Sequence, residues 1–453
     1  MRPASLKRKI LRTVILLFCL SIPFLIWRLW VVWAVDSQLA RIRAAGLPTN
    51  GEDLNKWYAA VPESENAALV LTEAFALRRN YPDNRSNLLW NFKLPPRGQT
   101  LNSNETELLT GYVEMNAPAL AKADEALKLP RSRYPIDCSF CSQTPLPHLT
   151  WLKHLAELNQ YKAELALARG DTDGAAHAIA SILGLARTLE SEPILISELV
   201  RLKILSIGVT TLERSLNHGL DSKGLTNLSG LFTRTAQVHC LSRAFIGERA
   251  MMTPYFRVSR HENPRIYAPL EQSEENSKDK LRSRDWGVLK LIGYYEMDLG
   301  QFLFTMGNVI ELAGQNPPDY VEIDRHFAKA AAVSRKKKRT FSAMIFSPFA
   351  HVGVRENESL ARLRLAVAGL AIEHYRNEKG QLPDTLDALK PGFVGQISQD
   401  PFTGLDLNYR RLPKGYVLYS VGRDLVDDEG KEPPASQTSR RDTGYDLPFT
   451  VKR

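Results

Sequence analysis

The stretch that decides the C-terminal fold begins with LARLRLAVAGLAIEHYRNEKG at residues 360–380 and continues with LPDTLDALKPGFVGQISQDPFTG at residues 382–404. Apolar residues recur at helical spacing in the first segment, whereas prolines and glycines interrupt the second. Two short β-like runs follow and end in the sequence YVLYSVGRDLVDDEG at residues 416–430. The pattern predicts a helix, a loop, a hairpin and an acidic tail, which together make a small α+β domain over residues 356–453.

The acidic tail is a candidate metal site. Asp424, Asp427 and Asp428 lie close together in a segment that begins after Gly422. Carboxylates and backbone carbonyls are the hard oxygen ligands that calcium prefers, although the spacing is not that of an EF-hand. The alternative is an acidic turn that is only solvated.

The motifs of this segment resemble the globular domain of the type II secretion major pseudopilin. That family has a helix ending similar to IEHYRNEKGQLPDTLDAL, a proline-containing loop, a small antiparallel sheet and a tail with an acidic calcium loop. The resemblance implies an α+β fold and strengthens the calcium hypothesis at Asp424 and Asp427. The matching positions are Ile372, Glu373, Tyr375, Gly380, Pro383, Leu386, Leu389, Pro401, Tyr416, Tyr419, Ser420, Gly422 and Asp424.

The N-terminal sequence predicts a membrane anchor. Residues 14–35 read VILLFCLSIPFLIWRLWVVWAV, which is about 33 Å of helix and matches the bilayer core. Basic residues concentrated in residues 1–13 predict a cytoplasmic N-terminus and an extracytoplasmic body. Arg28 interrupts the run, but its side chain can extend toward the interface. The alternative is a signal peptide cleaved near Ala34. The early basic residues are Arg2, Lys7, Arg8, Lys9 and Arg12.

The body between residues 36 and 355 reads as a mostly α-helical domain. Two amphipathic helices joined at ARGDTDGAA form a pair that resembles one tetratricopeptide unit, with no second copy at a fixed period. Gly170 marks the end of the first helix, and Asp171 or Asp173 can cap the second. Residues 259–285 are polar and poor in aliphatic side chains, which predicts a mobile loop.

Composition narrows the range of functions. The chain has 453 residues, a net charge of +9 and four cysteines. This length favours two or three domains, and the cysteine count is too low for a disulfide framework. Because part of the charge excess lies in the first twelve residues, and no nucleic-acid-binding motif is present, we expect no nucleic-acid partner.

Four further residues are candidates for a structural or chemical role. Cys138 and Cys141 have the spacing of a redox pair, but flanking prolines favour a local disulfide in an oxidising compartment. Glu248 and Arg249 lie in an otherwise apolar helical pattern and are candidates for a buried ion pair.

The last candidate site is a metal-binding pair, His154 and Glu157. His154 and Glu157 share a helix face, although an ordinary surface pair is the simpler interpretation. Phosphate-binding loops and hydrolase or metalloprotease signatures are absent from the sequence. No catalytic or cofactor-binding residue is therefore assigned.

These observations predict a bacterial inner-membrane protein with one span, a helical extracytoplasmic body and a pseudopilin-like C-terminal domain. The layout resembles membrane-anchored proteins of the bacterial envelope. About 320 residues separate the anchor from the pseudopilin-like helix, so filament assembly is not implied. We expect a non-catalytic structural or interaction protein with a protein or envelope-polymer partner. The alternatives are a hydrolase or metal enzyme built around Glu248, His154 or the cysteines, and an accessory component of a secretion apparatus.

Overall fold

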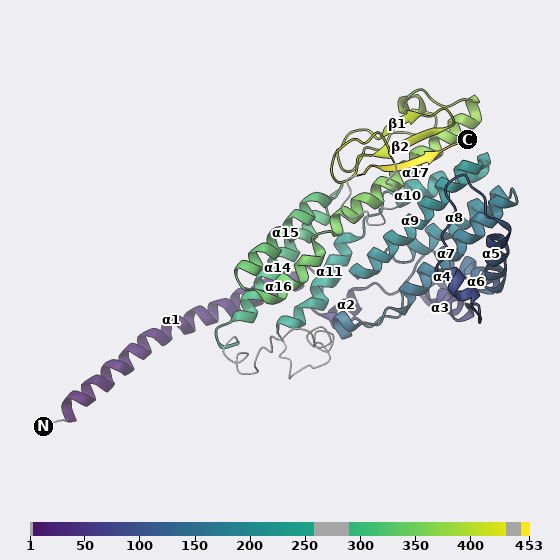
Figure 1. The fold of residues 1–453 in the computed structure, drawn as a ribbon. Coiled ribbons are helices and arrows are strands. Elements are labelled where there is room, and N and C mark those ends of the chain that lie inside the picture. The colour runs from purple at the N-terminus through teal and green to yellow at the C-terminus, as the bar shows by residue number, and fades with distance from the viewer. Residues whose placement is uncertain (1–2, 258–289, 432–444) are drawn as a thin grey trace. The chain divides into compact units, whose positions relative to one another are not determined.

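Helices make up most of the chain, and a small antiparallel sheet lies near its C-terminus, as the sequence predicts. The computed structural model describes residues 3–257, 290–431 and 445–453, without the side chains of residues 3–11, 13–17 and 20. The predicted mobile loop at 259–285 lies outside the described residues. The chain divides into two units, and Figure 1 labels the helices and strands that they contain. Unit 1 contains residues 1–58, 137–145 and 245–350; unit 2 contains residues 59–136, 146–244 and 351–453.

Unit 1 is built from helices. Its core includes a group of phenylalanine rings, among which Phe302 and Phe346 stack with their centroids 5.9 Å apart and Phe327 packs against Phe346 at 5.8 Å. Its elements are α1 (Pro3–Ala44), α2 (Gly51–Trp57), η2 (Cys138–Gln143), most of α11 (Leu241–Met252), η3 (Thr253–Phe256), α14 (Tyr294–Ala313), α15 (Tyr320–Lys336) and α16 (Thr340–Phe349).

The long helix α1 has two different faces. Val31, Val35 and Leu39 recur every four residues, are buried, and lie on the part of α1 that packs against α14. Arg28, which interrupts the apolar run, forms an ion pair of 2.5 Å with Glu296 of α14. Among the side chains that the structure describes, no helix is long and apolar enough to cross a membrane. The predicted span at 14–35 lies partly outside that set, so it stays a prediction.

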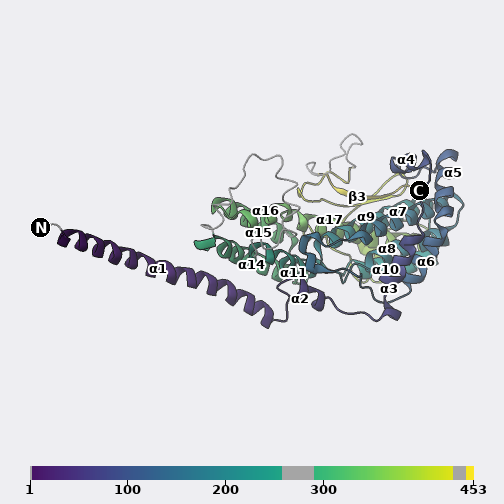
Figure 2. The same cartoon turned by 90° about the horizontal axis from the view of Figure 1, so that it is seen from below.

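Unit 2 is a layered helical assembly that carries the sheet. Figure 2 shows α7, α9 and α17 running beside one another, and α9 contacts both α7 and α17. The elements are η1 (Glu63–Glu65), α3 (Ala67–Leu77), α4 (Arg85–Trp90), α5 (Ser103–Met115), α6 (Ala117–Leu127), α7 (Pro147–Ala168), α8 (Thr172–Arg187), α9 (Leu195–His218), α10 (Ser222–Thr235), α17 (Val352–Lys379), η4 (Leu386–Leu389), β1 (Asn408–Arg411), β2 (Tyr416–Ser420) and β3 (Leu447–Val451).

The predicted helix pair is present as α7 and α8. Gly170 adopts a left-handed φ of 71° between them, a conformation that suits glycine. Asp171 then caps α8 by accepting a hydrogen bond of 2.8 Å from the Gly174 amide. Local sequence signals therefore fix this turn.

The C-terminal sheet has the order β1-β2-β3, and all of its pairings are antiparallel. It packs on α17, where Gly369 permits a close approach: a Cβ at this position would lie 2.7 Å from Cε1 of Phe449. The Tyr416 hydroxyl donates a hydrogen bond of 3.3 Å to the Gly369 carbonyl. Residues of the sheet, α17 and helices α3 and α6–α10 share one hydrophobic core. The segment 356–453 therefore packs as a part of unit 2 instead of enclosing a core of its own.

Candidate functional site: a charged groove in unit 2

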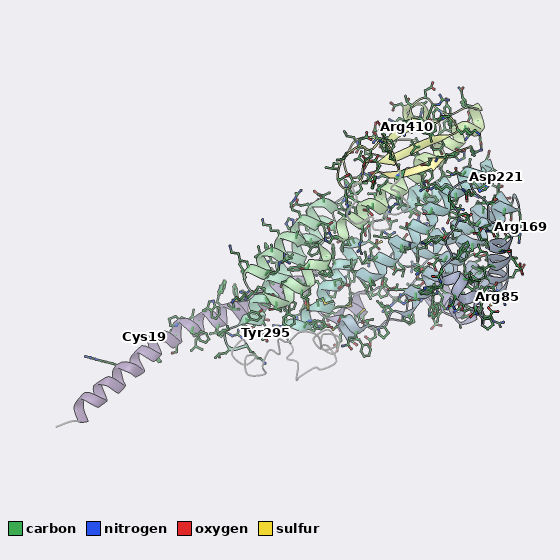
Figure 3. All side chains as sticks on the ribbon, in the orientation of Figure 1. Cys19, Arg85, Arg169, Asp221, Tyr295 and Arg410 are labelled. Carbon is green, nitrogen blue, oxygen red and sulfur yellow. The ribbon has the colours of Figure 1, made fainter. Side chains whose placement is uncertain are left out.

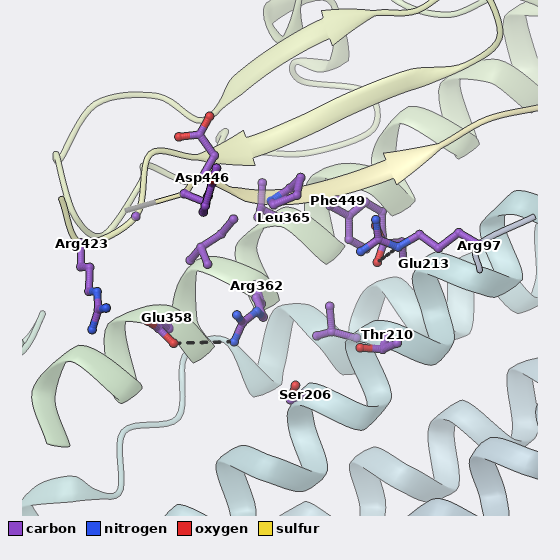
Figure 4. A pocket seen from close by; sticks show the side chains of 15 residues that line it. Arg97, Ser206, Thr210, Glu213, Glu358, Arg362, Leu365, Arg423, Asp446 and Phe449 are labelled. Atoms are coloured by element: carbon purple, nitrogen blue, oxygen red, sulfur yellow. Dashed lines mark ion pairs between the residues drawn. The ribbon is translucent and has the colours of Figure 1, made fainter. Parts of the chain in front are cut away.

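A pocket in unit 2 lies between α9, α17 and the start of β3 (Figure 4). Ser206, Thr210 and Glu213 recur along one face of α9 at spacings of four and three residues, so they line the same wall. Glu358, Arg362 and Leu365 do the same on α17. The remaining lining residues are Arg97, Val209, Gly422, Arg423, Tyr445, Asp446, Leu447, Pro448 and Phe449.

A second hollow continues the first along the same two helices. Both are lined by Ser206, Val209, Glu358 and Arg362, so together they form one continuous feature, which we call the groove. Aliphatic side chains of α9 provide an apolar floor in the second part. They are Leu199, Leu202, Leu205 and Val209.

Two of the three carboxylates in the groove are already engaged by the protein. Glu213 is only 4% exposed; it accepts a 2.6 Å hydrogen bond from the Thr450 amide and pairs with Arg97 at 3.1 Å (Figure 4). Asp446 is buried and accepts hydrogen bonds from the amides of Asp428 and Gly430. Burial raises the pKa of Asp446 despite these bonds. Neither carboxylate therefore contributes much negative charge at the surface of the groove.

The groove presents mainly positive charge to solvent. Lys203, Arg355 and Arg423 are exposed, and Arg362 is half-buried. We call these four residues the groove cations. Among the described residues that line the groove, Glu358 is the one carboxylate besides Glu213 and Asp446, and its Oε2 lies 4.0 Å from Nη1 of Arg362. With Arg97, the described lining residues include five cations and three carboxylates, which favours a cationic surface.

Other charged side chains of α9 and α17 point into the protein. Glu198 and Arg201 of α9 form a bidentate pair, with Nη2–Oε1 at 2.7 Å and Nε–Oε2 at 2.8 Å. Glu356 of α17 and Cys240 adjoin Glu198, and both help to lower its pKa. All four residues are buried, and we call them the inner cluster.

The two carboxyl groups of the inner cluster have opposite protonation preferences. Burial alone would raise the pKa of Glu198, but the charge and hydrogen bonds of Arg201 outweigh it and lower that pKa. Burial, reinforced by the Glu198 charge, raises the pKa of Glu356 well above its ordinary value. Glu356 therefore favours its protonated form, which can donate a hydrogen bond to Glu198. Its Oε1 has no hydrogen-bond partner among the described residues. The inner cluster joins α9 to α17.

Burial also suppresses the reactivity of Cys240, the cysteine of the inner cluster. Burial raises the pKa of the Cys240 thiol, and the nearby carboxylates add to the shift. The thiolate is the nucleophilic and metal-binding form, so burial suppresses both kinds of chemistry.

His154 and Glu157 line a separate pocket of unit 2, together with several aromatic side chains. Burial, with help from Arg78 and Lys153, lowers the pKa of His154 to about 4, so its imidazole is neutral near pH 7. Glu157 pairs with Lys153 at 3.5 Å. This pocket does not contain Glu248 or either predicted disulfide cysteine, which belong to unit 1.

The predicted calcium ligands lie in the turn after β2. Asp424 accepts a 3.3 Å hydrogen bond from the Val426 amide, and Asp427 accepts one of 2.8 Å from the Glu429 amide. In the part of the chain that is described, no group of three or more acidic, histidine or cysteine side chains is placed to hold a metal ion. Calcium binding by Asp424, Asp427 and Asp428 stays a prediction.

The predicted disulfide pair lies in η2 of unit 1. Cys138 and Cys141 are both buried, and both stand as thiols in the structure. The local disulfide expected in an oxidising compartment stays a prediction. Burial raises the pKa of Cys141 to about 11, which keeps its thiol protonated.

Glu248 and Arg249 are both buried. An ion pair between them stays a prediction. Among the described residues, Nε and Nη2 of Arg249 have no hydrogen-bond partner. Burial lowers the pKa of Arg249 to about 10.

The groove and the inner cluster were not anticipated from the sequence. The three-residue spacing of Glu198 and Arg201 in SELVR is a signal for a helical ion pair. No local sequence signal connects that pair with Glu356, because the contact depends on how α17 packs on α9.

Comparison with known proteins identifies no relative: no family model, curated protein or solved structure matches the chain.

Proposed function

We propose that this chain is a membrane-anchored, extracytoplasmic interaction protein of the bacterial envelope. Its groove binds an acidic segment of a partner protein, without catalysis. The observation that carries this proposal is the charge of the groove, whose described lining residues include more cations than carboxylates. Complementary charge favours encounter with a negatively charged partner and disfavours a basic one.

The floor of the groove indicates what kind of acidic partner fits. Leu202, Leu205 and Val209 of α9 are apolar and line the hollow beneath the cationic rim. A peptide can place apolar side chains on such a floor and carboxylates on the rim, as in helix-in-groove recognition. A uniformly charged polymer would leave the floor without a complementary group. An amphipathic acidic peptide is therefore the best match.

The surface of α1 supports the membrane part of the proposal. Large apolar side chains of this helix are exposed in the structure, and a bilayer would cover them. The ion pair of Arg28 with Glu296 offsets the one charge within the apolar run. The exposed residues are Phe18, Ile22, Leu25, Ile26, Trp27, Leu29, Trp30 and Trp33.

The binding proposal is tested with two fluorescent peptides in which leucine is spaced at helical intervals and the remaining positions are mainly glutamate or mainly lysine. The full chain, reconstituted in nanodiscs of zwitterionic lipid, should bind the glutamate peptide saturably and the lysine peptide far more weakly. Added salt should weaken the binding. Equal affinity for the two peptides, or no binding of either, would contradict the proposal.

The membrane proposal has its own test. Reporters active only outside the cytoplasm are fused after Asp36 and after Arg453 in separate fusion proteins. Both should be active, because the basic N-terminal segment is expected to remain in the cytoplasm. Inactivity at both positions would overturn the proposed topology without affecting the binding proposal.

A further inference from the structure

The pocket that contains His154 has a composition unlike that of the groove. It is formed by α4, α7, Tyr112 of α5 and the segments that flank α4, all within unit 2. Arg85, labelled in Figure 3, begins α4 and places its guanidinium 4.3 Å above the ring of Tyr81. Five aromatic side chains line the pocket, and we call it the aromatic pocket. They are Tyr81, Trp90, Phe92, Tyr112 and Tyr161.

The aromatic rings are held in place by one another. Phe92 packs edge-on against Tyr161 with centroids 5.8 Å apart, and Tyr81 packs against Tyr112 at the same distance. The Tyr81 hydroxyl donates a 2.9 Å hydrogen bond to the Leu108 carbonyl. Trp90 differs from these four because the residue is 85% exposed. An indole presented to water beside a pocket of packed rings is typical of a ligand-stacking group.

The polar groups of the aromatic pocket are mostly neutral. Asn80 accepts a 3.1 Å hydrogen bond from Arg78, and Asn87 and Ser86 also line the pocket. The Lys153–Glu157 ion pair balances its own charge. The Arg78 guanidinium is occupied above the ring of Trp151, at 4.3 Å from its centroid.

His154 adds an unsatisfied polar atom. Its Nδ1 is buried and has no hydrogen-bond partner among the residues that the structure describes. The lowered pKa leaves the ring neutral near pH 7. A neutral imidazole can donate from one nitrogen and accept at the other, which suits a hydroxyl group.

We propose that the aromatic pocket binds a pyranose ring of a neutral polysaccharide. Such a ring has an apolar C–H face, which packs on an aromatic ring, and an edge of hydroxyl groups, which need both donors and acceptors. The aromatic pocket provides Trp90 for the face, and Asn80, Asn87 and His154 for the edge. Pockets with aromatic walls and a few polar groups are the usual form of a small-ligand site. This site is separate from the groove and does not depend on the acidic partner.

The test uses calorimetric titration of the full chain in nanodiscs with cellohexaose, chitohexaose and mannohexaose. At least one should bind saturably, and Trp90→Ala should weaken that binding by about tenfold or more. Trp90→Phe should restore part of the affinity because a ring remains. Leu88→Ala is the matched control, since Leu88 is exposed on the same helix but does not line the pocket. Its affinity should equal that of the wild type.

Several outcomes would overturn the inference. One is the absence of saturable binding by all three sugars at about 10 mM. Another is equal affinity of the wild type and a Trp90→Ala variant whose thermal melting is unchanged. Displacement of the bound sugar by the glutamate peptide would place the sugar in the groove and would also contradict it. Failure of the peptide to bind would leave the sugar result unaffected, so the two proposals fail separately.

Discussion

The same two helices, α9 and α17, carry two sets of charged side chains with different consequences. The inner cluster is buried; its Arg201 pairs with Glu198 of the same helix, and Glu356 of α17 adjoins Glu198. The groove cations line an open hollow, in which two of the described carboxylates, Glu213 and Asp446, accept hydrogen bonds from backbone amides. Arg355 and Glu356 are neighbours in sequence, yet they belong to opposite sets, because successive helical residues point in different directions. The burial of a charged side chain and the groups that it contacts determine whether it stabilises the fold or faces solvent, where a ligand can reach it.

The largest expected effect is on the inner cluster. Arg201→Met would leave the ionised Glu198 buried without its cation, which should cost about 3–5 kcal/mol in the free energy of unfolding. Urea denaturation of the full chain measures this loss. Arg169→Met is the control, because Arg169 is exposed at the end of α7 (Figure 3), and its change should stay within about 0.5 kcal/mol. If the two variants had the same free energy of unfolding, the buried charges of the inner cluster would contribute no more to stability than exposed ones.

The next effect tests how closely the inner face of α17 is packed. Gly369→Ala would place a Cβ 2.7 Å from the buried ring of Phe449, which should destabilise unit 2 by about 1–3 kcal/mol. Gly307→Ala in α14 is the matched change, because nothing lies within 4 Å of its Cβ. That substitution should raise stability by up to about 1 kcal/mol through helix propensity. A gain in stability for both variants would show that the sheet yields to the added methyl group.

A smaller, pH-dependent effect follows from the raised pKa of Glu356. Between its unfolded pKa and its higher folded pKa, the folded chain holds one proton more than the unfolded chain. This term makes the free energy of unfolding fall as pH rises, by at most about 1.4 kcal/mol per pH unit. Glu356→Gln removes the titration and keeps a neutral hydrogen-bond donor beside Glu198.

We therefore expect Glu356→Gln to gain stability relative to the wild type as the pH rises from about 5 to about 8. Urea denaturation at the two pH values measures the difference. A wild-type-like pH dependence in this variant would mean that Glu356 is ionised in the folded chain, contrary to its place in the inner cluster.

The smallest expected effect on stability belongs to the groove cations. Arg355→Glu changes an exposed side chain and should alter the free energy of unfolding by no more than about 0.5 kcal/mol. Urea denaturation in parallel with Arg201→Met gives the comparison. A loss as large as that of Arg201→Met would show that Arg355 is structural.

The sequence predicts those parts of the fold that depend on local signals. Gly170 and Asp171 mark the turn between α7 and α8, and the structure has a left-handed glycine and an aspartate cap there. The helix before Gly380 and the hairpin of β1 and β2 are also present. In each case the residues that specify the structure are neighbours along the chain.

The groove was beyond local prediction because its walls come from distant segments. Glu213 accepts a hydrogen bond from the amide of Thr450 in β3 and pairs with Arg97, and both partners are distant from it in sequence. Glu198 and Arg201 suggest a helix-surface pair, whereas the packing of α17 buries both and adds Glu356. Whether such residues stabilise or bind is set by tertiary contacts, which composition and spacing do not specify.

The central claim is tested most directly by measuring affinity and stability together in Arg355→Glu/Arg362→Glu. The account predicts that its affinity for the glutamate peptide falls by about tenfold or more, because attraction is replaced by repulsion at the rim of the groove. Stability should stay close to that of the wild type, and Arg169→Glu should change neither quantity. Unchanged affinity in a folded double variant would contradict the claim that the groove binds an acidic partner.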